Sequence, residues 1–142
     1  MATLTVEIVA PEAALWTGPA SALVARSSEG DFTILAQHTS TVGDLVSSIV
    51  RVATDEGEIA FAVHSGFFQV GPGLEPETTL ATVLASVAER TTEIDVARAQ
   101  AAKEAAQNAL SVAQNSDDED AVLVLSAALE RAELRLRAAS VK

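Results

Sequence analysis

The chain has 142 residues, of which 49% are hydrophobic, and it carries a formal net charge of −11 without a single cysteine. This composition suits one compact domain with or without a helical appendage, and it excludes disulfides and thiolate metal sites. The acidic balance argues against a nucleic-acid partner and against direct binding to an anionic membrane. We find no signal-peptide pattern and no apolar run of about 18 residues, so any membrane association is expected to go through a partner.

The region up to about residue 88 has the pattern of an all-β domain. Short runs rich in β-branched residues alternate with Gly, Pro and Asp turn signals, which is typical of a sandwich or barrel. A hairpin is expected at Asp55-Glu56-Gly57, with Gly57 at a positive φ. We predict a β-sandwich over residues 1–86, with strands at 4–9, 22–27, 33–35, 42–46, 48–52, 59–63, 67–70 and 78–84.

The remaining residues, 89–142, have a helical pattern. No Gly or Pro follows Pro76, and alanine, the best helix former, becomes dominant. A helix to about residue 113 is expected, capped by Thr91 or Thr92, followed by an acidic turn at 115–120 and a second helix over 118–139. Apolar residues of the second helix recur every three or four positions: Val122, Leu125, Leu129, Ala132, Leu136 and Ala139. The short turn predicts an antiparallel two-helix hairpin, so the fold class is α+β.

No catalytic or metal-binding constellation stands out. The two histidines, His38 and His64, lack ligand spacing, and no serine sits in a nucleophile elbow. Gly71-Pro72-Gly73 is expected to be a turn, because no phosphate-loop sequence follows it. We therefore predict a non-catalytic protein with no required cofactor and no metal site.

Four charged residues of the hairpin carry the one binding hypothesis. Asp95 and Arg98 share a helical face, as do Arg131 and Arg135, and an antiparallel hairpin brings the start of one helix beside the end of the other. Three guanidinium groups repel one another unless an anion bridges them, and a triphosphate fits because arginine binds phosphate oxygens bidentately. The alternative is local pairing, with Asp95 capping its helix and pairing with Arg98 while neighbouring glutamates neutralise the other arginines.

Four segments in order along the chain resemble the epsilon subunits of bacterial F-type ATP synthases. They are Val6-Glu7-Ile8-Val9-Ala10-Pro11 with Leu15-Trp16-Thr17-Gly18 (an aromatic-x-Gly turn in the family); Glu29-Gly30-Asp31-Phe32-Thr33-Ile34-Leu35-Ala36-Gln37-His38; Phe61-Ala62-Val63-His64-Ser65-Gly66-Phe67-Phe68-Gln69-Val70; and Ile94-Asp95-Val96-Ala97-Arg98-Ala99. The chain departs from the family at Phe32 and Ser65, where glycine is usual, and at Ser40, where proline is usual. The resemblance spans the whole chain.

The resemblance implies a central-stalk subunit at the cytoplasmic face of the cell membrane. The sandwich is expected to dock onto the γ subunit and the c-ring, coupling proton-driven rotation to ATP synthesis. The hairpin is expected to regulate ATP hydrolysis, inserting into the catalytic α/β hexamer when extended. ATP, as a regulatory ligand, is expected at Ile94, Asp95, Arg98, Ala99, Arg131 and Arg135, with Glu89 a further candidate, although Ala105 replaces a basic residue found in some relatives. Two other classes stay open: a free-standing nucleotide sensor and a homodimeric β-sandwich adaptor.

Overall fold

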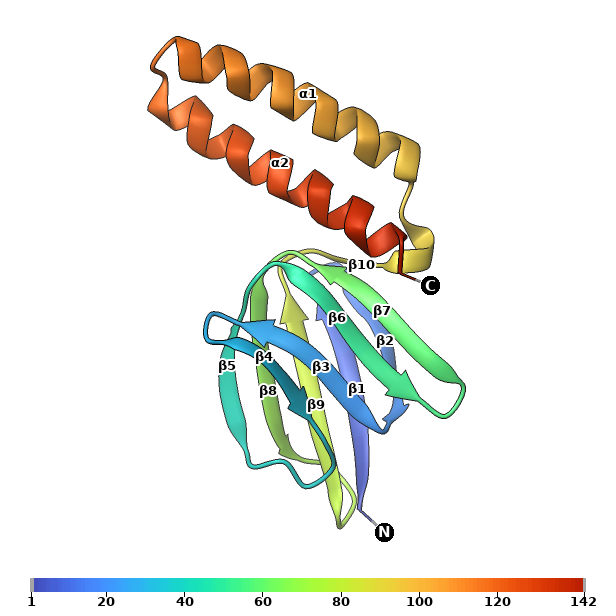
Figure 1. The fold of residues 1–142 in the computed structure, drawn as a ribbon. Coiled ribbons are helices and arrows are strands. Elements are labelled where there is room, and N and C mark those ends of the chain that lie inside the picture. The colour runs from blue at the N-terminus through green and yellow to red at the C-terminus, as the bar shows by residue number, and fades with distance from the viewer. Residues whose placement is uncertain (1, 142) are drawn as a thin grey trace. The chain divides into compact units, whose positions relative to one another are not determined.

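The computed structural model describes residues 2–141 and divides the chain into two compact units (Figure 1). The first unit ends at Arg90 and consists of strands, and the second begins at Thr91 and consists of helices. This architecture confirms the α+β class, with a β-sandwich followed by two helices.

The sandwich is built from two five-stranded sheets. Sheet A, in the order β2-β1-β9-β8-β5, contains β1 (Thr3–Ala10), β2 (Ala13–Ala20), β5 (Thr41–Leu45), β8 (Gly66–Pro72) and β9 (Thr78–Ala85). Sheet B, in the order β10-β7-β6-β3-β4, contains β3 (Ala22–Ser27), β4 (Gly30–Ile34), β6 (Ser48–Thr54), β7 (Gly57–Val63) and β10 (Ala88–Arg90). Strand β1 pairs parallel to β9 and antiparallel to β2.

The core lies between the two sheets, because alternate residues of each strand point inward. In β1, Leu4, Val6 and Ile8 are buried while Thr5 and Glu7 are half-buried on the other face. The largest fully buried side chain is Phe61 of β7. The cluster also contains Leu23, Ala25, Ile34, Leu45, Val50, Val52, Val63, Phe68, Val70, Ala81, Val83 and Ala85.

Gly57 and Gly66 occupy backbone conformations that favour glycine. Gly57 has a φ of 124° in the turn between β6 and β7, as the sequence predicts. Gly66 has a φ of 151°, and a Cβ there would collide with the carbonyl oxygen of Leu84 on β9. Ser65, which stands where the family usually has glycine, adopts a φ of 63°, so this turn holds a non-glycine residue in the left-handed region.

Several expected boundaries are wrong. The expected turn at 15–18 lies inside strand β2, whose register with β1 shifts at Ile8/Val9. Residues 88–90 form β10, which pairs with β7 although its sequence lacks β-branched residues. The expected turn at 71–73 is wrong in part, because β8 extends through Pro72.

The second unit is an antiparallel helical hairpin preceded by a single 3₁₀ turn, η1 (Thr91–Glu93). Helix α1 (Val96–Asn115) and helix α2 (Glu119–Ala139) pack along their length. The expected caps Thr91 and Thr92 are wrong, because both lie in η1 and Asp95 occupies the N-cap position. Asp118 caps α2, accepting a hydrogen bond from the Ala121 amide at 3.1 Å.

The side chains buried in the hairpin are small. Helix α1 buries Ala99, Ala106 and Ala113 at seven-residue intervals, and α2 buries Ala132, Leu134 and Ala138. Of the expected α2 seam, only Ala132 is fully buried, and the other five residues are half-buried. Leu134 and Ala138 lie on the opposite side of α2, so the simple seam prediction misses one of its buried faces. Helix α2 also contacts η1, which the helical period alone does not predict.

Candidate functional site

The start of α1 is held by the side chain of Asp95. Its Oδ1 accepts a hydrogen bond from the backbone amide of Arg98 at 3.0 Å. This is the N-cap interaction that satisfies one of the unpaired amides in the first turn. The carboxylate of Asp95 therefore serves the helix backbone, and within residues 2–141 it makes no ion pair with the Arg98 guanidinium.

Arg98 and Arg135 lie toward the same end of the hairpin, and Arg131 lies nearer the middle of α2. Arg98 lies 17 residues before the end of α1, and Arg135 lies 16 residues after the start of α2. At about 1.5 Å of rise per residue, these two positions are at nearly the same height along the hairpin. Arg131 lies 12 residues after the start of α2, about one turn away from Arg135.

For Arg98 and Arg131, the described residues show no local neutralisation by an ion pair. Across residues 2–141, neither Arg98 nor Arg131 forms an ion pair, and Glu130 and Glu133 pair with neither. Arg98 and Arg131 are both exposed. Their guanidinium groups are thus accessible to an anion, although Asp95 remains as a negative charge near the start of α1.

The other proposed ligand positions differ in accessibility. Ala99 is 2% exposed within the hairpin, so its side chain packs there and cannot contact a ligand. Ile94, between η1 and α1, is half-buried. Glu89 lies in β10 of the sandwich, where its Oε1 is 3.8 Å from Nε2 of the buried His64.

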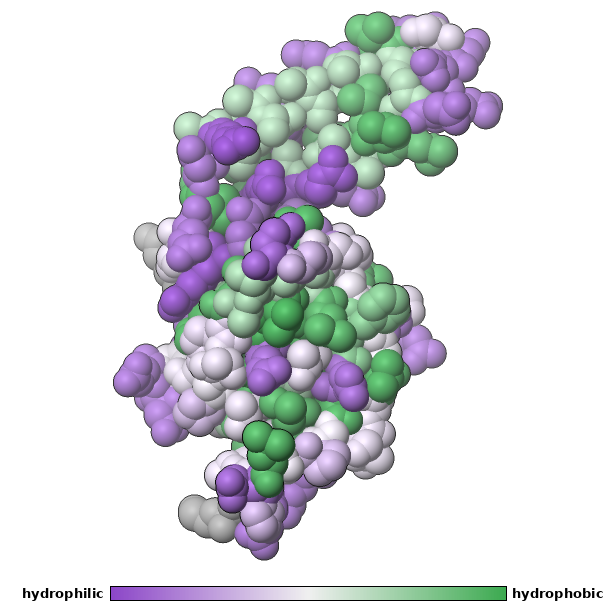
Figure 2. Space-filling view, turned by 180° about the vertical axis from the view of Figure 1, so that it is seen from behind, coloured by the Kyte–Doolittle hydropathy of each residue, from purple (hydrophilic) through white to green (hydrophobic). Residues whose placement is uncertain are grey.

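Exposed apolar side chains gather near the turn that joins the helices. Val112 on α1 and Leu123 and Val124 on α2 are each at least 67% exposed. Figure 2 shows the pale green surface of the alanine-rich helices together with purple patches of charged residues. An exposed apolar group of this kind is typical of a surface that contacts a partner.

A second candidate surface is the outer face of sheet A. Strand pairing aligns Val9, Leu84 and Phe67 in one cross-strand row, and Phe67 and Leu84 are 61% and 44% exposed. On edge strand β5 the partner of Phe67 is Asp44, and Val42, two pairs further along, is 72% exposed. This row was not predicted from the sequence. It could have been recognised from apolar residues at the outward-facing positions of strands whose other face is buried.

The described part of the chain offers no sign of metal binding or of a membrane-spanning helix. Within residues 2–141, no three His, Asp or Glu side chains gather where they could hold a metal ion. Neither described helix is apolar enough over a sufficient length to cross a bilayer.

Both units of the chain match known protein families. Residues 3–91 match the family "ATP synthase, Delta/Epsilon chain, beta-sandwich domain", and residues 92–140 match "ATP synthase, Delta/Epsilon chain, long alpha-helix domain". The ATP synthase epsilon chain of Streptomyces griseus is 37% identical over 99% of this chain and 98% of that one. The epsilon chain of a Cyanothece species is 34% identical, covering 96% of this chain and 95% of its own.

A solved structure has the same fold. A chain of the Euglena gracilis mitochondrial ATP synthase, from a structure containing OSCP, F1 and the c-ring, aligns with a TM-score of 0.78 and 26% identity. The alignment covers 98% of this chain and 82% of that one. With two family domains matched in order and relatives aligned over nearly their whole length, the chain belongs to the ATP synthase delta/epsilon family and is an epsilon subunit of the central stalk.

Proposed function

We propose that the sandwich docks onto the γ subunit and the c-ring and thereby helps to couple proton-driven rotation to ATP synthesis. The observation that carries this proposal is the apolar row of Val9, Leu84 and Phe67 on the outer face of sheet A. Such a row costs solubility in a free protein and is typical of a surface that a partner covers. The Euglena relative, which was solved within a complex that includes F1 and the c-ring, supports the same assembly.

The docking proposal is tested by pull-down from native membranes. Phe67→Asp places a charge on the most exposed side chain of the apolar row, and we expect it to abolish recovery of γ and c subunits. Thr33→Asp is the matched control, because Thr33 is exposed on β4 of the other sheet. Recovery of γ and c subunits at the same yield with both variants would exclude sheet A as the docking face. A homodimer recovered without these subunits would instead support an adaptor.

The hairpin is proposed to regulate ATP hydrolysis by adopting a second, extended position that enters the catalytic α/β hexamer. A switch of this kind needs two packings that differ by only a few kcal/mol. The alanine-rich contact between α1 and α2 supports this, since alanines bury little apolar area. The exposed Val112, Leu123 and Val124 add an apolar surface available to a second position.

Truncation tests the regulatory proposal directly. Ending the chain after Arg90 removes the second unit but keeps β10, which pairs with β7 in the sandwich. We expect the assembled complex to hydrolyse ATP faster than the complex with the full chain. Equal hydrolysis rates, with the truncated subunit still bound, would leave the hairpin with a structural role only.

ATP is proposed as the ligand that holds the hairpin folded, with its phosphates at Arg98, Arg131 and Arg135. The exposed side chains of Arg98 and Arg131, and the similar height of Arg98 and Arg135 on the hairpin, support this assignment. A ligand that binds only the folded form shifts the population toward it. The subunit itself is then a non-catalytic sensor, and the chemistry of ATP synthesis belongs to its partners.

Isothermal titration with ATP tests the ligand proposal on the isolated chain. We expect binding heat that falls sharply in Arg98→Gln and Arg131→Gln, because each variant removes one phosphate donor. Lys103→Gln is the control, since it removes one positive charge from α1 outside the set. No heat at millimolar ATP, or equal loss in the control, would remove the proposal.

A further inference from the structure

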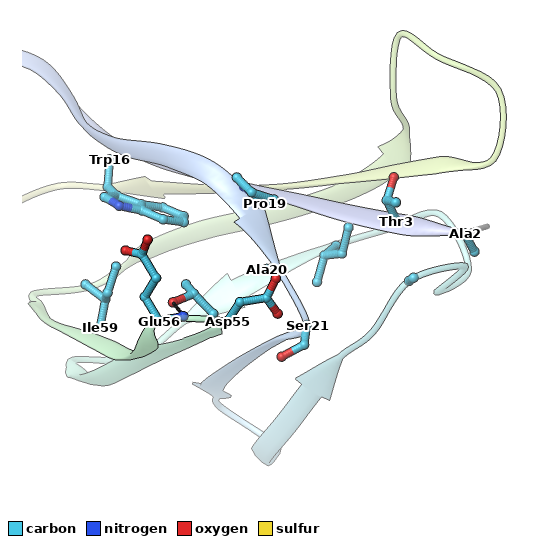
Figure 3. Close-up of a pocket in the computed structure, with 12 residues that line it drawn as sticks. Ala2, Thr3, Trp16, Pro19, Ala20, Ser21, Asp55, Glu56 and Ile59 are labelled. Atoms are coloured by element: carbon cyan, nitrogen blue, oxygen red, sulfur yellow. Dashed lines mark hydrogen bonds between the residues drawn. The ribbon is translucent and has the colours of Figure 1, made fainter.

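A cleft of about 660 Å³ opens at one edge of the sandwich, beside edge strand β2 (Figure 3). It lies between β2, the start of β1 and the turn that joins β6 to β7. Its walls include Leu4, Trp16, Pro19, Ala36 and Ile59, and Asp55 and Glu56 stand at its rim. None of the lining residues is basic, so the cleft combines an apolar wall with uncompensated negative charge.

The indole of Trp16 is fixed against its own strand. A Cβ built on Gly18 would approach Cζ2 of Trp16 to 3.0 Å, so the ring lies closely over Gly18 and would have to shift to admit a larger residue. Trp16 is half-buried and packs against the sandwich core. The ring therefore presents a preorganised aromatic surface to the cleft.

The two carboxylates are held by a defined turn. The amide of Glu56 donates to Oγ1 of Thr54 at 3.2 Å, and the same hydroxyl donates to the carbonyl of Gly57 at 2.7 Å. Figure 3 shows Glu56 extending toward the Trp16 ring, while Asp55 lies toward Ala20 and Ser21. The geometry thus places one carboxylate beside an indole.

Neither carboxylate has an ionic partner within residues 2–141. Two arginines of the same unit form ion pairs with other acids: Nε of Arg26 lies 2.6 Å from Oδ1 of Asp31, and Nη1 of Arg51 lies 3.0 Å from Oε1 of Glu58. Because no residue that lines the cleft is basic, a cationic side chain that enters it meets the two carboxylates without a competing positive charge on the cleft walls.

We propose that this cleft binds an arginine side chain carried by an extended segment of a partner protein. A guanidinium stacks on an indole face and at the same time donates to a carboxylate, which a compact ammonium does less well. The cleft runs along an edge strand and is open to solvent, so a side chain can enter it from a segment lying beside β2. The site shares no residue with the apolar row on sheet A or with the hairpin arginines.

The single tryptophan makes the test direct. Trp16 is the only tryptophan and the chain has no tyrosine, so fluorescence reports on this cleft alone. The probes are acetyl-Gly-Arg-Gly-amide and its citrulline counterpart, which has a similar shape without the charge, titrated into the full chain at constant ionic strength. We expect a saturable fluorescence change with the arginine peptide and a much smaller one with the citrulline peptide.

Variants that remove the carboxylates test whether Asp55 and Glu56 bind the arginine side chain. Asp55→Asn with Glu56→Gln should weaken binding of the arginine peptide about fivefold, as expected for loss of exposed ion pairs. Glu12→Gln with Glu29→Gln removes the same charge from exposed sites outside the cleft and should leave binding unchanged. Equal responses to both peptides, equal weakening in both double variants, or no saturable response would each overturn the proposal.

Discussion

The two units of this chain are built from different kinds of buried side chain. The sandwich core contains fully buried Phe61, Leu23 and Ile34, together with many valines. The hairpin buries five alanines and one large residue, Leu134. Complete burial of a Leu, Ile or Phe contributes about 1.5–3 kcal/mol, and an alanine methyl contributes much less.

Because of this difference, we expect the two units to differ in stability. The sandwich buries large side chains between two sheets and has the apolar area of a domain that is stable by itself. The hairpin depends on helix propensity, two aspartate caps and a thin contact between helices. A stable sandwich joined to a marginal helical unit fits the proposed function, in which the sandwich stays docked while the hairpin changes position.

The largest expected effect tests the rigidity of the sandwich. Gly66→Ala introduces a Cβ that meets the Leu84 carbonyl and lies 2.9 Å from the Ala85 Cα, at a φ of 151°. We expect a loss of about 3 kcal/mol in the free energy of unfolding, measured by urea denaturation. Gly71→Ala on the same strand is the control, because nothing lies within 4 Å of its added Cβ. Similar losses in the two variants would contradict the importance of this turn.

The next effect tests the thin contact in the hairpin. Ala106→Leu overfills the contact between helices, because Ala106 is 6% exposed, and we expect it to destabilise the hairpin by about 2 kcal/mol. Ala105→Leu is the control, since its side chain is exposed on the same helix. Backbone amide exchange measured separately for the two units should show faster exchange in α1 and α2 and unchanged exchange in the sandwich. Equal acceleration in both units would mean that they unfold together.

A smaller effect is expected at the helix caps. Asp95→Ala leaves the Arg98 amide without its acceptor and should cost the hairpin about 1 kcal/mol, seen as loss of helical circular dichroism on mild heating. Asp118→Ala removes the equivalent bond at the start of α2 and should have a similar effect. A hairpin that tolerates both substitutions would be held by stronger contacts than the buried alanines supply.

The smallest effect concerns a surface ion pair of the sandwich. Nε of Arg26 donates to Asp31 at 2.6 Å, and this hydrogen bond lowers the pKa of the Asp31 carboxyl. A lowered pKa stabilises the fold above the unfolded value of about 3.9, and the contribution is lost as the pH falls through the folded value. Carboxyl-carbon NMR titration should show the Asp31 midpoint moving upward in Arg26→Gln. An unmoved midpoint would show that the pair does not persist in solution.

Much of the architecture could be predicted from local pattern. Alternation in β1, the glycine at position 57 and the alanine-rich, glycine-free C-terminal region indicate a sandwich followed by two helices. The acidic run before α2 also predicts its start, because negative charge is favoured at a helix N-terminus. These features depend on neighbours in sequence, so they can be recognised without a fold.

The candidate sites were less predictable. Arginine spacing placed Arg98 and Arg135 at one end of a hairpin, but the cap at Asp95 and the burial of Ala99 depend on how the first turn forms. The cleft at Trp16 combines β2 with a turn about 40 residues later. The local sequence of neither segment predicts that the two lie side by side.

Local patterns in the sequence specify the order of a strand region and a helical region, together with the residue types available to fill each core. The folded chain adds that residues 15–18 extend a strand, that Leu84 and Phe67 form one exposed row with Val9, and that Trp16 faces Glu56. The physical reason is that periodicity records whether a side chain points inward or outward, whereas strand order and register decide which distant side chains become neighbours.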